Sequence, residues 1–116
     1  MKLGEIEIHH LNDGTFRLDG GAMFGVIPRP LWERKMPADA RNRVLLAMNS
    51  LLLRVAGKWI LVETGAGDKW DAKRSDIFDF QPPPRLLDQL AARGLTPAQI
   101  DIVINTHLHL DRKSVV

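Results

Sequence analysis

The stretch THLHLD at residues 106–111 decides how this chain is interpreted, and it directly follows the apolar stretch IDIVIN at residues 100–105. The apolar stretch predicts a short buried strand. Successive side chains of an extended strand point to opposite sides, so His107, His109 and Asp111 would share one side and the two intervening leucines the other. The pattern therefore predicts three metal-capable groups together at the C-terminal end of a strand.

The chemistry of these three groups favours a particular kind of metal. Neutral imidazole and carboxylate ligands suit zinc, iron or manganese, and zinc is common in His-rich hydrolytic sites. The chain has no cysteine, so a thiolate site and a disulfide framework are both excluded. From the residues alone, a second interpretation stays open, in which the same groups are polar residues at an exposed strand end.

The N-terminal half of the chain predicts strands and loops. Alternating residues 5–11 predict a strand, the turn sequence NDGT at 12–15 predicts a hairpin, and residues 15–19 predict the returning strand. Residues 20–30 contain three glycines and two prolines, which predicts a loop rather than a helix. A short helical turn is expected before Pro37.

The second half of the chain alternates strands with helical segments. Residues 42–63 predict two strands that are joined at Ala56-Gly57-Lys58, and a polar loop follows through residue 84. RLLDQLAARG at residues 85–94 predicts a helix that buries a stripe of leucines and ends at Gly94. TPAQ at residues 96–99 predicts one further helical turn. Together these elements predict an α/β (α+β) protein with a mixed sheet.

Composition and charge exclude several classes of function. The formal net charge is +2, from 16 basic and 14 acidic residues that are interspersed along the chain, so no nucleic-acid surface is expected. The longest apolar run, residues 45–55, contains Asn49, Ser50 and Arg54, which excludes a membrane span. The N-terminus lacks the apolar core of a signal peptide. We therefore expect a cytoplasmic location and no membrane partner.

Three stretches resemble one protein family. GLTPAQIDIVINTHLHLD at residues 94–111 resembles the metallo-β-lactamase superfamily, whose hallmark H-x-H-x-D-H follows a short buried strand. VETGAG at residues 62–67 resembles the strand-ending D-T-G of the same superfamily. DGTFRLDGGAMFGVIPRPLW at residues 13–32 resembles the branch of N-acyl homoserine lactonases and related hydrolases.

The resemblance implies a fold, a cofactor and a reaction. The fold would be a four-layered αββα sandwich with two zinc ions at one edge of the paired sheets. His107 and His109 would bind the first ion and Asp111 the second, and Asp111 would also handle the proton. A metal-bound hydroxide would attack a small-molecule substrate of the lactone or ester type.

The chain departs from the family pattern at its end and at one supporting position. Arg112 stands where the last histidine of the motif belongs, and a guanidinium cannot ligate a metal. The later ligands of the family are not found in the sequence, and RKSVV does not resemble what should follow. Residues 1–116 are therefore expected to be the N-terminal part of one incomplete domain, to bind metal weakly and to hydrolyse little.

The resemblance points to four further residues. Glu63 stands where D-T-G has its aspartate, and Thr64 matches the threonine. Both would support the site from behind the ligands, with a plain strand-end carboxylate as the alternative for Glu63. Met23 and Phe24 resemble the substrate-facing loop of the lactonase-like branch, with packing in the core as the alternative. His9 and His10 are interpreted as ordinary strand residues.

Two other functions remain open beside the hydrolase. The first is a non-catalytic module that uses this part of the fold for self-association, because an incomplete sandwich would leave edge strands and an inner face exposed. A homo-oligomer is therefore expected. The second is oxidoreductase chemistry on a di-iron version of the same site.

Overall fold

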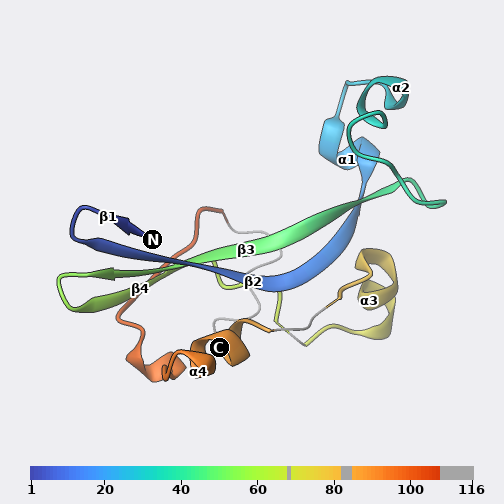
Figure 1. Ribbon diagram of the computed structural model, residues 1–116. Helices are drawn as coiled ribbons and strands as arrows, with labels where there is room; N and C mark the ends of the chain where they lie inside the picture. Colours follow the sequence, from blue (N-terminus) through green and yellow to red (C-terminus); the bar gives the residue numbers. More distant parts are fainter. Residues whose placement is uncertain (68, 82–84, 108–116) are drawn as a thin grey trace. The chain divides into compact units, whose positions relative to one another are not determined.

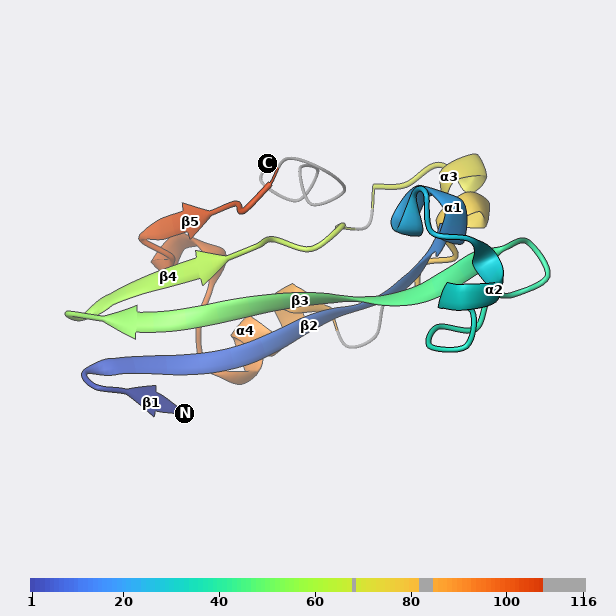
Figure 2. The ribbon, with the colours of Figure 1, turned by 90° about the horizontal axis from the view of Figure 1, so that it is seen from above.

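The computed structural model describes residues 1–67, 69–81 and 85–107. His109, Asp111 and Arg112 lie outside these residues. The described chain confirms the predicted α/β class, with a five-stranded sheet in the order β1-β2-β3-β4-β5 (Figures 1 and 2). The strands are β1 (Lys2–Leu3), β2 (Ile6–Asp19), β3 (Arg43–Val55), β4 (Lys58–Val62) and β5 (Ile102–Ile104). The helical segments are α1 (Gly20–Phe24), α2 (Arg29–Trp32), α3 (Ala72–Phe78), α4 (Leu86–Ala92) and η1 (Pro97–Gln99).

The described chain divides into two compact units. The first unit comprises residues 1–14, 48–67, 69 and 85–107, and the second comprises residues 15–47 and 70–81. β2 and β3 contribute residues to both units. No helix in the described part of the chain is long and apolar enough to cross a membrane.

The hairpin that was predicted at residues 12–15 is wrong, because β2 runs without a turn from Ile6 to Asp19. Asn12 and Gly14 do make the local contact of an Asx turn, in which the Gly14 N–H donates to Asn12 Oδ1 at 2.8 Å. The Asp13 side chain, however, is buried and accepts hydrogen bonds from residues far along the chain. These contacts hold the backbone extended through a sequence that usually reverses it.

The hairpin between β3 and β4 is confirmed. Leu51 pairs with Val62 and Val55 with Lys58 in antiparallel register. Ala56 and Gly57 form the turn with φ values of 50° and 77°. Positive φ at both central residues gives the backbone twist that suits a two-residue hairpin.

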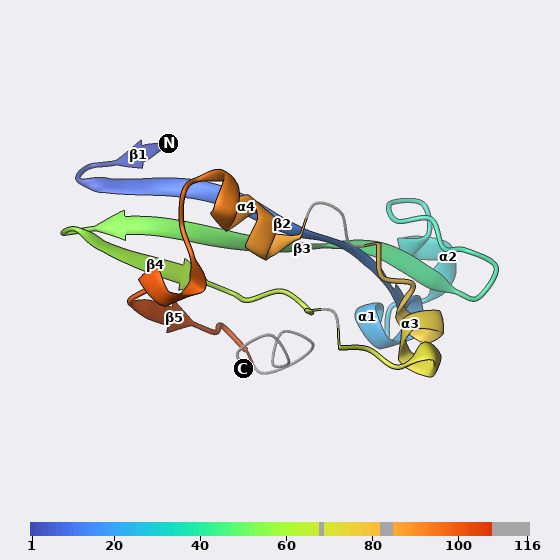
Figure 3. The same cartoon turned by 90° about the horizontal axis from the view of Figure 1, so that it is seen from below.

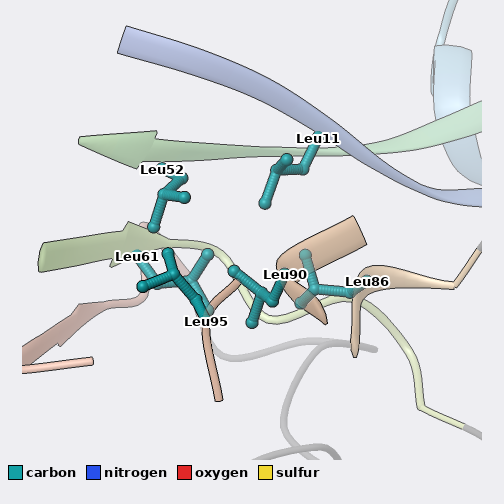
Figure 4. Packing of buried hydrophobic residues seen from close by; sticks show 6 residues of the cluster. All are labelled: Leu11, Leu52, Leu61, Leu86, Leu90 and Leu95. Atoms are coloured by element: carbon teal, nitrogen blue, oxygen red, sulfur yellow. The ribbon is translucent and has the colours of Figure 1, made fainter. Parts of the chain in front are cut away.

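Figure 3 shows α4 against one face of the sheet, and the core of the first unit lies between the two. The predicted helix at residues 85–94 is confirmed, and Gly94 follows it with a φ of 72°. Leu87 was expected in the buried stripe, but 61% of it is exposed. The seven-residue helix α4 buries only the narrow face that carries Leu86 and Leu90. Six leucines form the core in Figure 4, namely Leu11, Leu52, Leu61, Leu86, Leu90 and Leu95.

The second unit contains two helices that the sequence interpretation missed. Residues 20–24, predicted as a loop, form α1, because the Asp19 carboxylate caps it by accepting from the Ala22 N–H at 2.9 Å. Residues 72–78, predicted as part of a polar loop, form α3, which Asp71 caps in the same way. The helical turn expected before Pro37 is present as α2 and the turn after it.

β5 was predicted as a buried strand, and this part of the prediction is wrong. Ile102, Val103 and Ile104 are 42%, 41% and 44% exposed. β5 pairs with β4 in parallel register and ends the strand order of the sheet. The described residues provide no layer that covers its outer face.

Candidate metal centre

The segment that carries the predicted metal ligands starts at the edge of the sheet where β4 and β5 both end. Because the two strands are parallel, with Val62 beside Ile104, their C-terminal ends meet at this edge. The chain continues directly from β4 into Glu63, whose N–H donates to the Ile104 carbonyl at 2.9 Å. From β5 it continues through Thr106 to His107. Two loops that lie 43 residues apart in sequence therefore meet at one place.

Glu63 connects these two loops through its side chain. The residue is buried and has a φ of 67°, in the left-handed region that non-glycine residues rarely adopt. Its Oε1 accepts from the Thr106 N–H at 2.5 Å and also from the Thr106 hydroxyl. The carboxylate thus fixes both the backbone and the side chain of the residue that precedes His107.

His107 lies at the open side of this arrangement. Its side chain is 62% exposed, and its Nδ1 lies 2.9 Å from Thr106 Oγ1 and 4.0 Å from Glu63 Oε1. Histidines that ligate metals commonly have a hydrogen-bonding partner on the other ring nitrogen, which fixes the orientation of the ring. Thr106 and Glu63 can provide this orientation to His107.

The described residues contain only part of the predicted zinc site. Within residues 1–67, 69–81 and 85–107, no group of three or more His, Cys, Asp or Glu side chains is placed to hold a metal. His109 and Asp111 stand beyond this part of the chain, so the three-residue site stays a prediction. The orientation of His107 fits the first ligand of such a site, and the predicted set of imidazoles and a carboxylate suits zinc.

The structure places the remaining predicted residues in different units. Thr64 is buried in the first unit, next to Glu63. Met23 and Phe24 belong to α1 in the second unit. Phe24 stacks on Trp32 with ring centroids 4.9 Å apart, while Met23 is 42% exposed. The packing alternative therefore describes Phe24, and Met23 retains a surface that a ligand can contact.

Asp13 is a residue of this region that the sequence interpretation missed. Its Oδ2 accepts from the Ala66 N–H at 3.0 Å, and its Oδ1 accepts from the Leu86 N–H at 2.8 Å. These donors lie 53 and 73 residues away in sequence. In the sequence, Asp13 stands two residues after Leu11, on the same side of an extended strand. The surrounding sequence NDGT, however, is typical of a turn.

Comparison with known proteins identifies the same superfamily. The family model described as "Metallo-beta-lactamase superfamily" matches residues 44–112. The comparison with curated proteins gave no match.

Three solved structures are similar to the chain. The first is a probable metal-dependent hydrolase from Staphylococcus aureus, 38% identical, with a TM-score of 0.86. The second is the hydrolase AbOPH of the beta lactamase superfamily, 27% identical, with a TM-score of 0.69. The third is AidC, a dizinc quorum-quenching lactonase in complex with the product N-hexanoyl-L-homoserine, 25% identical, with a TM-score of 0.66. Each match covers 96% of this chain, but only 40%, 36% and 36% of the respective structure.

Proposed function

The chain belongs to the metallo-beta-lactamase superfamily, and we propose that it forms part of a zinc-dependent hydrolase, which acts on a lactone or a related ester when the later ligands of the family are present. The observation that carries the proposal is the orientation of His107 by Thr106 and Glu63 at the edge where β4 and β5 end. The similarity to a dizinc lactonase supports the choice of metal and of substrate class.

Each residue of the proposed site has a distinct role. His107 and His109 would hold one zinc ion, and Asp111 would be a ligand of a second. When bound, zinc supplies Lewis acidity and lowers the pKa of water toward neutrality. Glu63 holds Thr106, which orients the His107 ring. The Asp111 carboxylate accepts the proton that is released when water attacks the substrate and passes it to the leaving alcohol.

The second unit carries an exposed apolar segment that includes the end of α1 and the start of α2. Residues 23–31 expose four large apolar side chains: Met23 at 42%, Val26 at 99%, Ile27 at 49% and Leu31 at 58%. Exposed apolar surface of this kind favours an apolar ligand. We propose that Met23 offers apolar contact surface to such a ligand.

Zinc titration of the 116-residue chain by calorimetry tests the proposed site. We expect weak binding that the substitution His107→Ala abolishes. His10→Ala is the matched control, because His10 is an exposed histidine on β2. Its Nε2 lies 2.9 Å from Asn49 Oδ1. Arg112→His, which completes the H-x-H-x-D-H motif, should strengthen binding by about tenfold or more, since it replaces a repelling cation with an imidazole. Equal zinc binding by the original chain and the His107→Ala variant would contradict the proposal.

Activity is tested with N-hexanoyl homoserine lactone as the substrate. We expect little turnover by this chain, because Arg112 replaces a ligand and the chain spans about two-fifths of the similar structures. Turnover should appear in a longer protein of the same family that carries these residues and the later ligands. Tight binding of two zinc ions together with rapid lactone turnover by the 116-residue chain would contradict the expected inactivity.

A second candidate function, self-association, is favoured by an open apolar face on the first unit. Leu52 and Leu61 point into the core, so their neighbours along β3 and β4 point to the opposite side of the sheet. The strand registers place six residues together there, and we call them the open apolar face: Leu51, Leu53, Ile60, Val62, Ile102 and Ile104.

We propose a second copy of the chain as the partner of the open apolar face. All six side chains are uncharged, so two copies can approach without repulsion between like charges. The alternative occupant is the part of the similar structures that the match does not cover. A monomer over the whole accessible concentration range in sedimentation equilibrium would contradict self-association.

A further inference from the structure

The Asp13 carboxylate holds two distant backbone segments against β2. The side chain is buried at 7% exposure, and a buried carboxylate is stable only when its oxygens are satisfied. One oxygen accepts from Ala66, in the segment that follows β4, and the other accepts from Leu86, the first residue of α4. Asp13 therefore fixes the loop after β4 and the start of the helix that covers the core.

The segment that Asp13 holds has a strained backbone. Glu63 and Gly65 have φ values of 67° and 69°. A non-glycine residue such as Glu63 adopts this conformation only when its surroundings enforce it. A Cβ atom added to Gly65 would lie 2.1 Å from Asp13 Oδ2. The carboxylate thus packs directly against the backbone two residues after Glu63, where it can maintain this conformation.

The same segment is connected to His107 through Thr106. The Glu63 carboxylate accepts from Thr106, and Thr106 Oγ1 contacts His107 Nδ1. A shift of the Gly65–Ala66 backbone would move Glu63 and release Thr106. All residues of this path belong to the first unit.

We propose that Asp13 is a positioning residue of the candidate metal centre, which sets the ring of His107 through the Gly65–Ala66 backbone, Glu63 and Thr106. The proposal deepens the proposed hydrolase function and rests on it for its biological meaning. The structural part of the proposal, the orientation of His107, involves only residues 13, 63–66, 106 and 107, and it can be tested without any metal.

The substitution Asp13→Asn tests this role. The amide keeps one acceptor but directs its NH2 group at a backbone N–H, so one of the two hydrogen bonds is lost. Asp101→Asn is the matched control, because Asp101 Oδ2 also accepts a backbone hydrogen bond, from Trp59 at 2.8 Å, at the opposite end of β4. The readouts are hydrogen exchange of the Thr106 and Ala66 amides, the NMR shifts of the His107 ring, and zinc affinity.

We expect Asp13→Asn to increase Thr106 amide exchange by about tenfold and to shift the His107 ring signals, while Asp101→Asn changes neither. Zinc affinity should fall by about tenfold in Asp13→Asn, the lower end of the effect of supporting partners in metal sites. Unchanged Thr106 exchange and His107 signals in Asp13→Asn, or equal changes in Asp101→Asn, would overturn the proposal.

Two further results separate the possible failures. If the unsubstituted chain binds no zinc while Asp13→Asn still alters Thr106 and His107, the positioning role stands and the hydrolase function fails. If Asp13→Asn does not fold, native-state hydrogen exchange of the unsubstituted chain decides. One common free energy of opening is then expected for the backbone amides of Ala66, Leu86 and Thr106. A different free energy of opening for the Thr106 amide would overturn the proposal.

Discussion

Gly65 is the single residue whose replacement should most directly disturb the loop after β4. Its φ of 69° strains any other residue, and an added Cβ would overlap Asp13 Oδ2. We expect Gly65→Ala to lower the free energy of unfolding by more than about 2 kcal/mol. Gly57→Ala is the control, since Gly57 has a similar φ of 77° with nothing within 4 Å of an added Cβ. It should lower the free energy by about 1 kcal/mol. Equal losses in urea denaturation would show that the overlap with Asp13 is unimportant.

Glu63 and Asp13 show what could be predicted at the residue scale. Glu63 was expected to support the site because its neighbours match a family pattern, and the structure places its carboxylate on Thr106. The structural role of Asp13 could not be predicted from the sequence, because its hydrogen-bond donors Ala66 and Leu86 are dozens of residues away. A local sequence pattern contains no information on contacts of that range. The N-D-G sequence also fits a turn, which explains why the turn was predicted.

α4 is the element whose packing should contribute most to the stability of the first unit. Leu90 is 2% exposed and belongs to the leucine core, whereas Leu87 is 61% exposed on the same helix. We expect Leu90→Ala to lower the free energy of unfolding by about 2–5 kcal/mol, because it leaves a cavity. Leu87→Ala should lower it by less than about 0.5 kcal/mol. Similar effects of both substitutions on the urea midpoint would contradict the assigned core face.

The turn that leads into β3 should make stability depend on pH in acid. Hydrogen bonds, first of all from the Arg43 backbone N–H, hold the pKa of Asp39 below its usual value of 3.8. A lowered pKa in the folded state stabilises the protein above the unfolded pKa, and this contribution is lost as the pH falls below about 4. We expect Asp39→Asn to reduce the loss of stability between about pH 5 and pH 2. An unchanged acid slope in thermal melts would contradict this role.

The elements differ in how far their sequences determine them. The hairpin at Ala56-Gly57 and the helix before Gly94 were predictable, because turn residues and apolar spacing are local signals. α1 and α3 were missed because each is a short helix whose main signal is a capping aspartate, at Asp19 and Asp71. Glycines in one segment and polar residues in the other concealed that signal.

At the scale of the whole molecule, burial depends on layers that one chain segment cannot reveal. β5 was predicted to be buried because its residues are all apolar, yet all three are more than 40% exposed. An apolar strand sequence predicts that the strand is covered, but it does not identify the layer that covers it. The same limit applies to the candidate metal centre, since its supporting residues Glu63 and Thr106 are placed while the sites of His109 and Asp111 are not described.

The open apolar face should therefore drive association between copies of this chain. We expect the mass in sedimentation equilibrium to rise with concentration, and Leu51→Glu to abolish the rise by placing a charge on the open apolar face. Leu87→Glu is the matched control, because Leu87 is an exposed leucine of the same unit that lies on α4 rather than on that face. It should associate like the unsubstituted chain. If Leu51→Glu also sediments like the unsubstituted chain, another surface drives the association, and the open apolar face is not the interface.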